Sequence, residues 1–150
     1  MKTKVIAICN QKGGVGKTTS AVTLGYGLSS KGLRTLIVDT DPQGHVAFSF
    51  GLEKTPGFYR LIVEEEPLSS IVLQARTNLD IVPGDKRSEK VKRYVAGLDY
   101  HEAVLSDIFV DTNYDVIIID TAPQSRCTPC RCLGHCGLGA HSYQAGCNGG

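Results

Sequence analysis

Short apolar runs and longer stretches with helical periodicity alternate along this chain. Three continuous apolar runs predict strands buried on both faces of a sheet. They occupy residues 5–9, 35–38 and 116–119. Between the first two, Ala21, Leu24 and Leu28 recur at helical spacing, which predicts a helix over residues 17–30. A strand, a helix and a strand in this order predict a parallel sheet with a right-handed crossover.

The segment between the second and third runs is predicted to hold shorter elements. Helices are expected at residues 45–50, 58–64, 86–98 and 100–110, and short strands at 71–73 and 79–82. Val91, Tyr94 and Val95 form the apolar stripe of the amphipathic helix over residues 86–98. The predicted fold class is therefore α/β, with a mostly parallel sheet flanked by helices.

The pattern stops after Pro123. Residues 124–150 contain six glycines and five of the six cysteines, but none of the 15 acidic residues. No helical or strand periodicity is visible there. We therefore predict one domain over residues 1–123 and a disordered Cys/Gly-rich tail over 124–150.

Composition and charge narrow the class of protein. The chain has 150 residues, is 41% hydrophobic and 21% charged, and has a net charge of +1. This balance is ordinary for a globular domain and provides no global basic field for nucleic acid. No apolar run approaches the ~20 residues of a membrane span, and no signal-peptide cleavage pattern follows the N-terminus. A cytoplasmic protein without a membrane partner is expected.

A glycine-rich run between the first strand and its helix carries the most specific chemistry. It reads Asn10-Gln11-Lys12-Gly13-Gly14-Val15-Gly16-Lys17-Thr18-Thr19. Such a turn exposes backbone N–H groups that bind phosphates, with Lys17 reaching the β/γ-phosphates and Thr18 ligating Mg²⁺. Gln11 stands where the strict phosphate-loop pattern has its first glycine. A glycine turn that only packs a helix against a strand is the alternative.

Three aspartates follow predicted strands. Asp39 and Asp41 follow the second strand, and Asp120 follows the third. Carboxyl ends of parallel strands meet at the edge where open α/β sheets bind ligands. Taken singly, these residues fit a solvated turn or a strand cap; together, beside a phosphate loop, they indicate a nucleotide site.

These motifs together resemble a known family. The segments Lys12–Thr18, Asp39-Thr40-Asp41-Pro42-Gln43-Gly44 and Asp115–Pro123 resemble the deviant Walker A loop, the following acidic motif and the Walker B strand of the ParA/MinD ATPase superfamily. The ParA/Soj partition branch fits best, and the resemblance covers residues 1–123. It implies a P-loop NTPase fold and Mg-ATP hydrolysis.

The resemblance also implies a role for each motif residue. The phosphates of ATP would be wrapped by Gly13, Gly14, Val15, Gly16, Lys17, Thr18 and Thr19. Lys12 would reach across a dimer interface, and it forms the implied catalytic set with Lys17 and Asp41, which positions the attacking water. Mg²⁺ would be held by Thr18, Asp39 and Asp120.

The implied biological role is plasmid or chromosome partitioning. Family members form an ATP-dependent homodimer, bind nonspecific DNA and are stimulated by a partner DNA-binding protein. In them another strand, after the Walker B strand, covers the phosphate-loop strand. We therefore expect a sheet that is incomplete at its C-terminal side, with residues 5–9 at an open edge. A non-enzymatic, truncated nucleotide-binding remnant with a metal-binding cysteine tail is the alternative.

The tail and two other features have competing explanations. The composition of the tail fits an out-of-frame or otherwise aberrant ending. Alternatively, Cys127-x2-Cys130-x-Cys132-x3-Cys136 could bind zinc or an iron–sulfur cluster. Disulfides are the third alternative, and a cytoplasmic compartment disfavours them. Cys9 is predicted to be an inert core thiol. The basic stripe of Lys86, Lys90 and Arg93 is expected to be a solvated helix face, with contact to DNA phosphates as its alternative.

Overall fold

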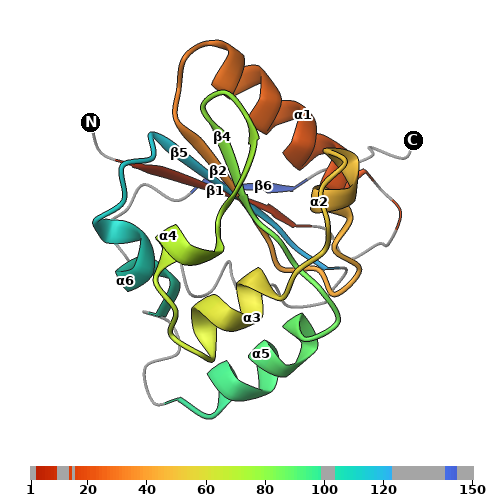
Figure 1. Ribbon diagram of the computed structural model, residues 1–150, viewed down its shortest axis with the longest axis vertical. Helices are drawn as coiled ribbons and strands as arrows, with labels where there is room; N and C mark the ends of the chain where they lie inside the picture. The colour runs from red at the N-terminus through yellow and green to blue at the C-terminus, as the bar shows by residue number, and fades with distance from the viewer. Residues whose placement is uncertain (1–2, 10–13, 15, 99–103, 123–140, 145–150) are drawn as a thin grey trace.

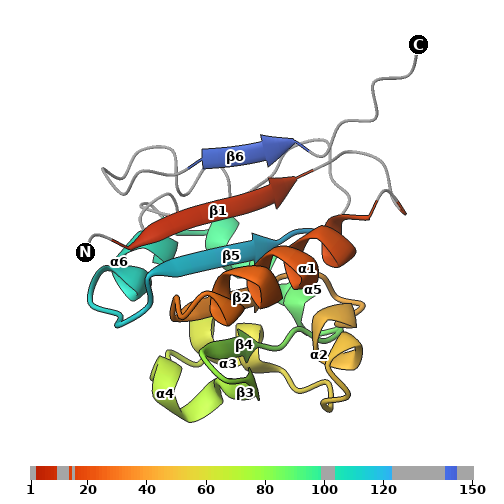
Figure 2. The same ribbon diagram turned by 90° about the horizontal axis from the view of Figure 1, so that it is seen from above.

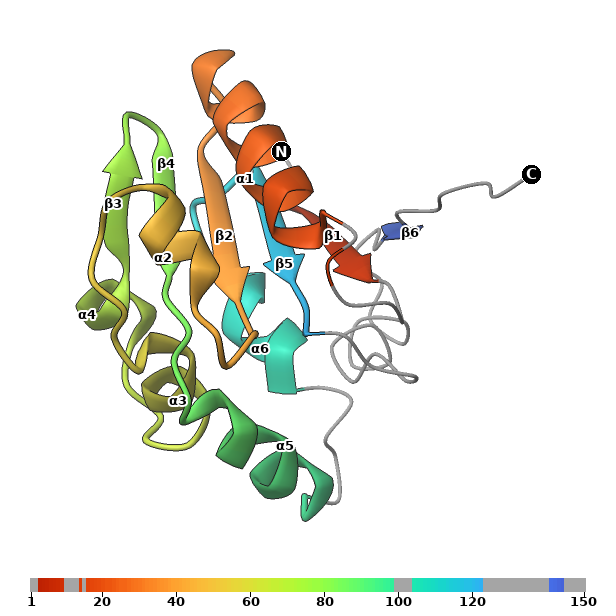
Figure 3. The same cartoon turned by 90° about the vertical axis from the view of Figure 1, so that its right-hand side faces the viewer.

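A mostly parallel, six-stranded sheet forms the centre of the molecule. The computed structural model describes residues 3–9, 14, 16–98, 104–122 and 141–144. Within them the strand order is β3-β4-β2-β5-β1-β6. The strands are β1 (Lys4–Cys9), β2 (Thr35–Asp39), β3 (Leu73–Arg76), β4 (Leu79–Val82), β5 (Val116–Asp120) and β6 (His141–Gln144). Among the described strands only the β3–β4 pair is antiparallel. In Figure 3 the arrow of β3 points opposite to those of β2 and β5. The predicted fold class is confirmed.

Helices cover both faces of this sheet (Figure 1). They are α1 (Lys17–Ser30), α2 (His45–Ser49), α3 (Gly57–Ile62), α4 (Leu68–Ile71), α5 (Ser88–Ala96) and α6 (Val104–Val110). Ala21 of α1 and Val46 of α2 belong to one apolar cluster. Phe58 of α3, Val91 of α5 and Phe109 of α6 belong to the other. The sheet therefore lies between two separate helical layers.

The alternation of side chains along β5 explains why its first four residues, 116–119, are all apolar. Val116 and Ile118 join the cluster under α1, whereas Ile117 and Ile119 join the cluster under α3, α5 and α6. All four are buried. A strand covered on both faces favours apolar side chains at successive positions, which is why continuous apolar runs predict such strands.

α1 has the bounds that the sequence predicts, and it packs closely on the sheet. A Cβ atom at Gly25 would lie 2.6 Å from Cδ1 of Ile37 in β2. The helix begins after Gly16, which has the left-handed backbone conformation with φ 80°. Glycine adopts this conformation at little cost, so the chain can turn sharply from the phosphate loop into α1.

Several predicted elements need correction. The expected strand over residues 71–73 is wrong at its start, because Ile71 ends α4 and β3 begins at Leu73. The extended Pro67 precedes α4, where a proline can start a helix but could not continue one. The helix expected over 86–98 spans only Ser88–Ala96, because a turn anchored on Asp85 precedes it. Within the predicted 100–110 helix, α6 begins at Val104, and residues 99–103 lie outside the described part.

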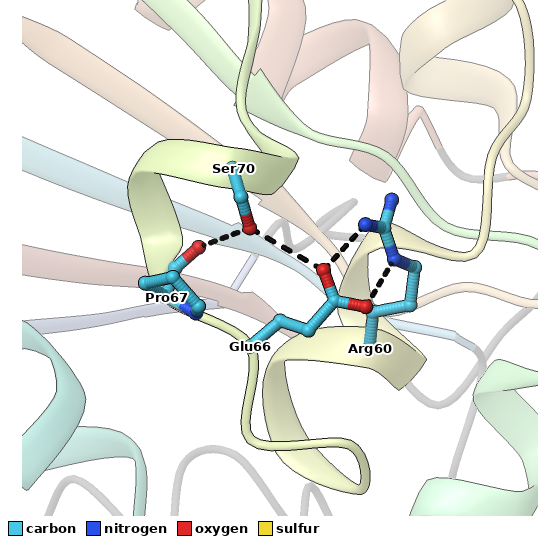
Figure 4. A network of polar contacts seen from close by, with 4 residues as sticks. All are labelled: Arg60, Glu66, Pro67 and Ser70. Atoms are coloured by element: carbon cyan, nitrogen blue, oxygen red, sulfur yellow. Dashed lines mark hydrogen bonds and ion pairs between the residues drawn. The ribbon is translucent and has the colours of Figure 1, made fainter.

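A small network of polar contacts links α3 and α4 to the segment between them (Figure 4). The Arg60 guanidinium donates two hydrogen bonds to the Glu66 carboxylate, and its Nε atom lies 2.8 Å from Oε1. The Ser70 hydroxyl donates to the Pro67 carbonyl at 2.8 Å and also approaches Glu66. The Arg60 and Glu66 side chains are partly exposed, so the network fixes the local turn more than it stabilises the fold.

The expected open edge at β1 is wrong. Figure 2 shows β6 beside β1 on the side away from β5. The pairing is parallel and runs from Ile6 opposite His141 to Cys9 opposite Gln144. Backbone N–H and C=O groups make this pairing, so it needs no apolar periodicity in residues 141–144. The rest of the tail lies outside the described residues, and its predicted disorder stays a prediction.

Cys9, at the end of β1, is disulfide-bonded, so the prediction of an inert thiol is also wrong. The other five cysteines of the chain all lie between residues 127 and 147, outside the described ranges. No helix in the described part of the chain is long and apolar enough to cross a membrane.

Candidate nucleotide-binding site

A cavity of about 620 Å³ opens where the phosphate loop meets the carboxyl ends of the strands. Its lining includes five described residues of the loop and of the first turn of α1: Gly14, Gly16, Lys17, Thr18 and Thr19. The turn after β2 and two helices supply the rest: Asp41, Pro42, Gln43, His45 and Glu89. The structure thus brings the phosphate loop and Asp41 together, as the sequence predicts.

Thr18 and Asp120 are in direct contact beneath this cavity. The Thr18 hydroxyl donates a hydrogen bond of 2.6 Å to Oδ2 of Asp120. The other carboxylate oxygen of Asp120 is buried and has no hydrogen-bond partner. A buried carboxylate oxygen without a partner is costly, unless a ligand fills the position in front of it. A hydroxyl and a carboxylate at this spot are oxygen ligands of the kind that Mg²⁺ prefers.

Asp39 lies beside Asp120, because the two residues are paired in the register of β2 and β5. Its carboxylate is fully buried and accepts hydrogen bonds from the backbone N–H groups of Asp41, at 3.0 Å, and Val46, at 3.2 Å. These bonds shape the turn that leads from β2 into α2. Asp39 therefore positions the Asp41 turn as well as adding a second negative charge beside Asp120.

Burial makes both carboxylates reluctant to ionise, and a neighbouring carboxylate adds to the effect in each case, Asp120 for Asp39 and Asp41 for Asp120. Burial, and then the charge of Asp120, raises the pKa of Asp39 to about 7. Burial also raises the pKa of Asp120 to about 6, although the Thr18 hydrogen bond and the Lys17 charge oppose the rise. A cation bound between them would favour their charged forms, so the pair is electrostatically suited to a divalent ion.

Asp41 differs from the other two aspartates, since its side chain lines the cavity. Its Oδ1 accepts the backbone N–H of Gln43 at 2.9 Å, and its carbonyl accepts the N–H of Gly44 at 3.0 Å. The turn is therefore held at both its side chain and its backbone. This holds Asp41 in the wall of the cavity that the phosphate loop also lines.

The structure places most of the predicted site residues, but not all of them. Gly14, Gly16, Lys17, Thr18, Thr19 and Asp41 line the cavity, and Asp39 and Asp120 lie at the ends of adjacent strands below it. Lys12, Gly13 and Val15 fall outside the described residues, so their roles stay predictions. Sequence reasoning missed His45 and Glu89, and it did not single out Gln43, although Gln43 belongs to the acidic motif.

The comparison with protein families agrees with this geometry. A sequence profile described as an AAA domain matches residues 3–133. The chain belongs to this AAA domain family. The match includes the phosphate loop and all three aspartates of the site.

Comparison with individual proteins confirms the resemblance to ParA/Soj-type ATPases. The chain is 38% identical over 126 residues to the sporulation initiation inhibitor protein Soj of Bacillus subtilis, covering 80% of this chain and 50% of Soj. It is 34% identical over 126 residues to the chromosome partitioning protein ParA of Myxococcus xanthus, covering 80% and 44% of the two chains. The chain thus spans about half the length of these curated relatives.

A solved structure shows the same fold. Cobyrinic acid a,c-diamide synthase from Mycobacterium smegmatis, crystallised with an ATP analogue and magnesium, superposes with a TM-score of 0.83 at 28% identity. The match covers 95% of this chain and 59% of the synthase. The sheet and its flanking helices are therefore those of a P-loop NTPase in the AAA domain family.

Proposed function

We propose that this chain binds Mg-ATP in the cavity and hydrolyses it. The observation that carries the proposal is the Thr18–Asp120 contact at the base of the phosphate loop, with an unpartnered carboxylate oxygen beside it. Nucleotide would bind with its phosphates on Lys17 and on the loop N–H groups. Thr18 and Asp120 would hold Mg²⁺, with Asp39 behind them; the bound ion would neutralise phosphate charge.

The chemistry assigned to the protein is positional. Phosphoryl transfer needs its nucleophile in line and its negative charge compensated, rather than a covalent intermediate on the protein. Lys17 would contribute fixed positive charge, and Asp41 would orient a water molecule towards the terminal phosphorus atom. The water oxygen then bonds to that phosphorus as the bond to the ADP oxygen breaks, with release of ADP and phosphate.

The cellular role that we propose is partitioning of plasmid or chromosomal DNA in the cytoplasm. The similarity to Soj and ParA supports it. This role includes ATP-dependent homodimerisation, in which Lys12 would act, nonspecific DNA binding and stimulation by a partner DNA-binding protein. Lys90 and Arg93 are exposed on the side of α5 opposite its buried residues, and Lys86 is exposed in the turn before the helix, where DNA phosphates could reach them.

Binding and phosphate release measured on the whole chain would test the biochemical proposal. Lys17→Ala should weaken Mg-ATP binding by roughly 10- to 100-fold, because a charged hydrogen-bond donor to phosphate is worth about 1.5–3 kcal/mol. Lys31→Ala is the matched control, since Lys31 is exposed just after α1. Asp41→Asn should retain binding and lose phosphate release.

Two results would contradict the proposal in different ways. No Mg-ATP binding by the wild-type chain would refute the nucleotide site itself. If the wild-type chain binds Mg-ATP but releases no more phosphate than Asp41→Asn does, hydrolysis is refuted and the chain is a nucleotide-binding remnant. A stoichiometric metal that is lost on Cys130→Ser would favour the cysteine tail as a separate metal site.

A further inference from the structure

Glu89 is the one described cavity residue that comes neither from the phosphate loop and the start of α1 nor from the turn after β2 and the start of α2. It occupies the first turn of α5, yet it lines the same cavity as Lys17 and Asp41. Its side chain is exposed and makes no hydrogen bond or ion pair with any residue in the described part of the chain. An unpaired carboxylate at a site for phosphate would repel the ligand, so its presence there needs a physical reason.

The start of α5 is fixed against the turn that carries Asp41. A Cβ atom at Gly84 would lie 2.7 Å from the carbonyl oxygen of Asp39 and 2.8 Å from that of Asp41. Asp85 then caps the following turn, accepting the N–H of Arg87 on its side chain at 2.9 Å and the N–H of Ser88 on its carbonyl at 2.8 Å. Backbone contact at Gly84 therefore ties the α5 start to Asp41.

The rest of α5 has little freedom to move Glu89 away from the cavity. Ser88, Val91 and Val95 are buried, and the two valines belong to the same apolar cluster as Phe58 of α3. The Glu89 carboxylate thus adds a negative charge to a cavity wall that already holds Asp41. A charge fixed in this position acts on every ligand that enters the cavity.

How strongly Glu89 repels a ligand depends on the net charge of that ligand. A triphosphate without metal is an anion whose repulsion by Glu89 is uncompensated, whereas Mg²⁺ removes two negative charges from the same ligand. Magnesium also keeps several of its water ligands when it binds phosphates, and those waters can donate hydrogen bonds to carboxylates. Glu89 therefore opposes the metal-free anion more strongly than the magnesium complex.

We propose that Glu89 is a specificity-determining residue that makes this cavity select the magnesium complex of a nucleoside triphosphate over the metal-free anion. The inference rests on the proposed function, because it assumes that the cavity binds nucleotide. It assigns Glu89 no part in the chemical step, and its effect is on which form of the ligand binds.

The experiment compares two ligands and two variants of the full chain. Calorimetric titration with ATP in excess EDTA, and with ATP in excess Mg²⁺, gives the ratio of the two dissociation constants. Glu89→Gln should reduce this ratio about tenfold, equivalent to about 1.4 kcal/mol, mainly through tighter binding of metal-free ATP. Glu53→Gln, at an exposed acid away from the cavity, should leave the ratio unchanged.

The outcomes separate this inference from the proposed function. If wild type binds ATP and Glu89→Gln leaves the ratio unchanged, Glu89 has no selective role and the inference alone is wrong. If Glu53→Gln lowers the ratio equally, the effect is one of net charge, and the inference is again wrong. If wild type binds neither form, the nucleotide site is refuted and the inference with it. Matching circular dichroism spectra would show that the variants remain folded.

Discussion

Asp120→Asn should stabilise the metal-free protein, and the gain should grow with pH. Burial raises the pKa of Asp120 to about 6 from an ordinary value of 3.8. The folded chain therefore holds this proton more tightly than the unfolded chain does. The stability that protonation provides is complete below about pH 4 and is lost as pH rises through 6. Asparagine is neutral at every pH, so the variant avoids this loss.

The magnitude follows from the two pKa values. Once Asp120 is fully ionised, the loss amounts to about 3 kcal/mol, at 1.36 kcal/mol per pH unit. About half of it has already occurred at pH 5, so the advantage of Asp120→Asn should be larger at pH 8 than at pH 5 by about 1.5 kcal/mol. For a chain of this length, that corresponds to about 3–6 °C in Tm. Relief of Asp39, which Asp120 repels, adds in the same direction.

Thermal unfolding followed by circular dichroism in EDTA at pH 5 and pH 8 measures this difference. EDTA matters because a bound cation would stabilise the ionised wild type and hide the effect. Asp111→Asn is the control, since Asp111 is exposed and its neutralisation should produce no such trend. An advantage of Asp120→Asn that is equal at the two pH values, or smaller at pH 8, would refute the reasoning.

Other substitutions probe the packing and the base of the site. Gly84→Ala should cost about 1–3 kcal/mol in urea unfolding, because its Cβ would overlap the backbone carbonyls of Asp39 and Asp41. Gly27→Ala, within α1 and with nothing within 4 Å, should instead stabilise by about 0.5–1 kcal/mol; a loss there would contradict the open space seen around Gly27. Thr18→Val should weaken Mg-ATP binding at least tenfold, whereas Thr18→Ser keeps the hydroxyl and should bind like wild type. Equal binding by both variants would contradict the role assigned to the hydroxyl.

The parts of the fold that could be predicted are those in which a local pattern and burial agree. β2 and β5 carry the continuous apolar runs 36–38 and 116–119 because both their faces are covered, and α1 has its predicted bounds. Residues 71–73 were ambiguous, since a short apolar run can end a helix or begin a strand. At this point the chain does both, with α4 ending at Ile71 and β3 beginning at Leu73.

Some residues of the site could likewise be predicted from the sequence, and others could not. Lys17, Thr18 and Asp41 belong to contiguous motifs whose spacing indicates their chemistry, so the sequence could place them. Glu89 reaches the cavity only because Gly84 packs against the Asp41 turn, and no local pattern records a contact of this kind. The β6 pairing was missed for a related reason, because it relies on backbone groups that every residue except proline has.

The pairing of β1 has a consequence for the order in which the chain can fold during synthesis. Of the described strands, β1 is synthesised before the others, but Lys4 pairs with Val116 and Ile6 with His141. Its two edges therefore stay unpaired until residues 116–120 and 141–144 have emerged. Contacts so distant in sequence form slowly, and an exposed strand of this kind is open to wrong pairing meanwhile. The strand that leads into the phosphate loop is thus made well before the two strands that enclose it.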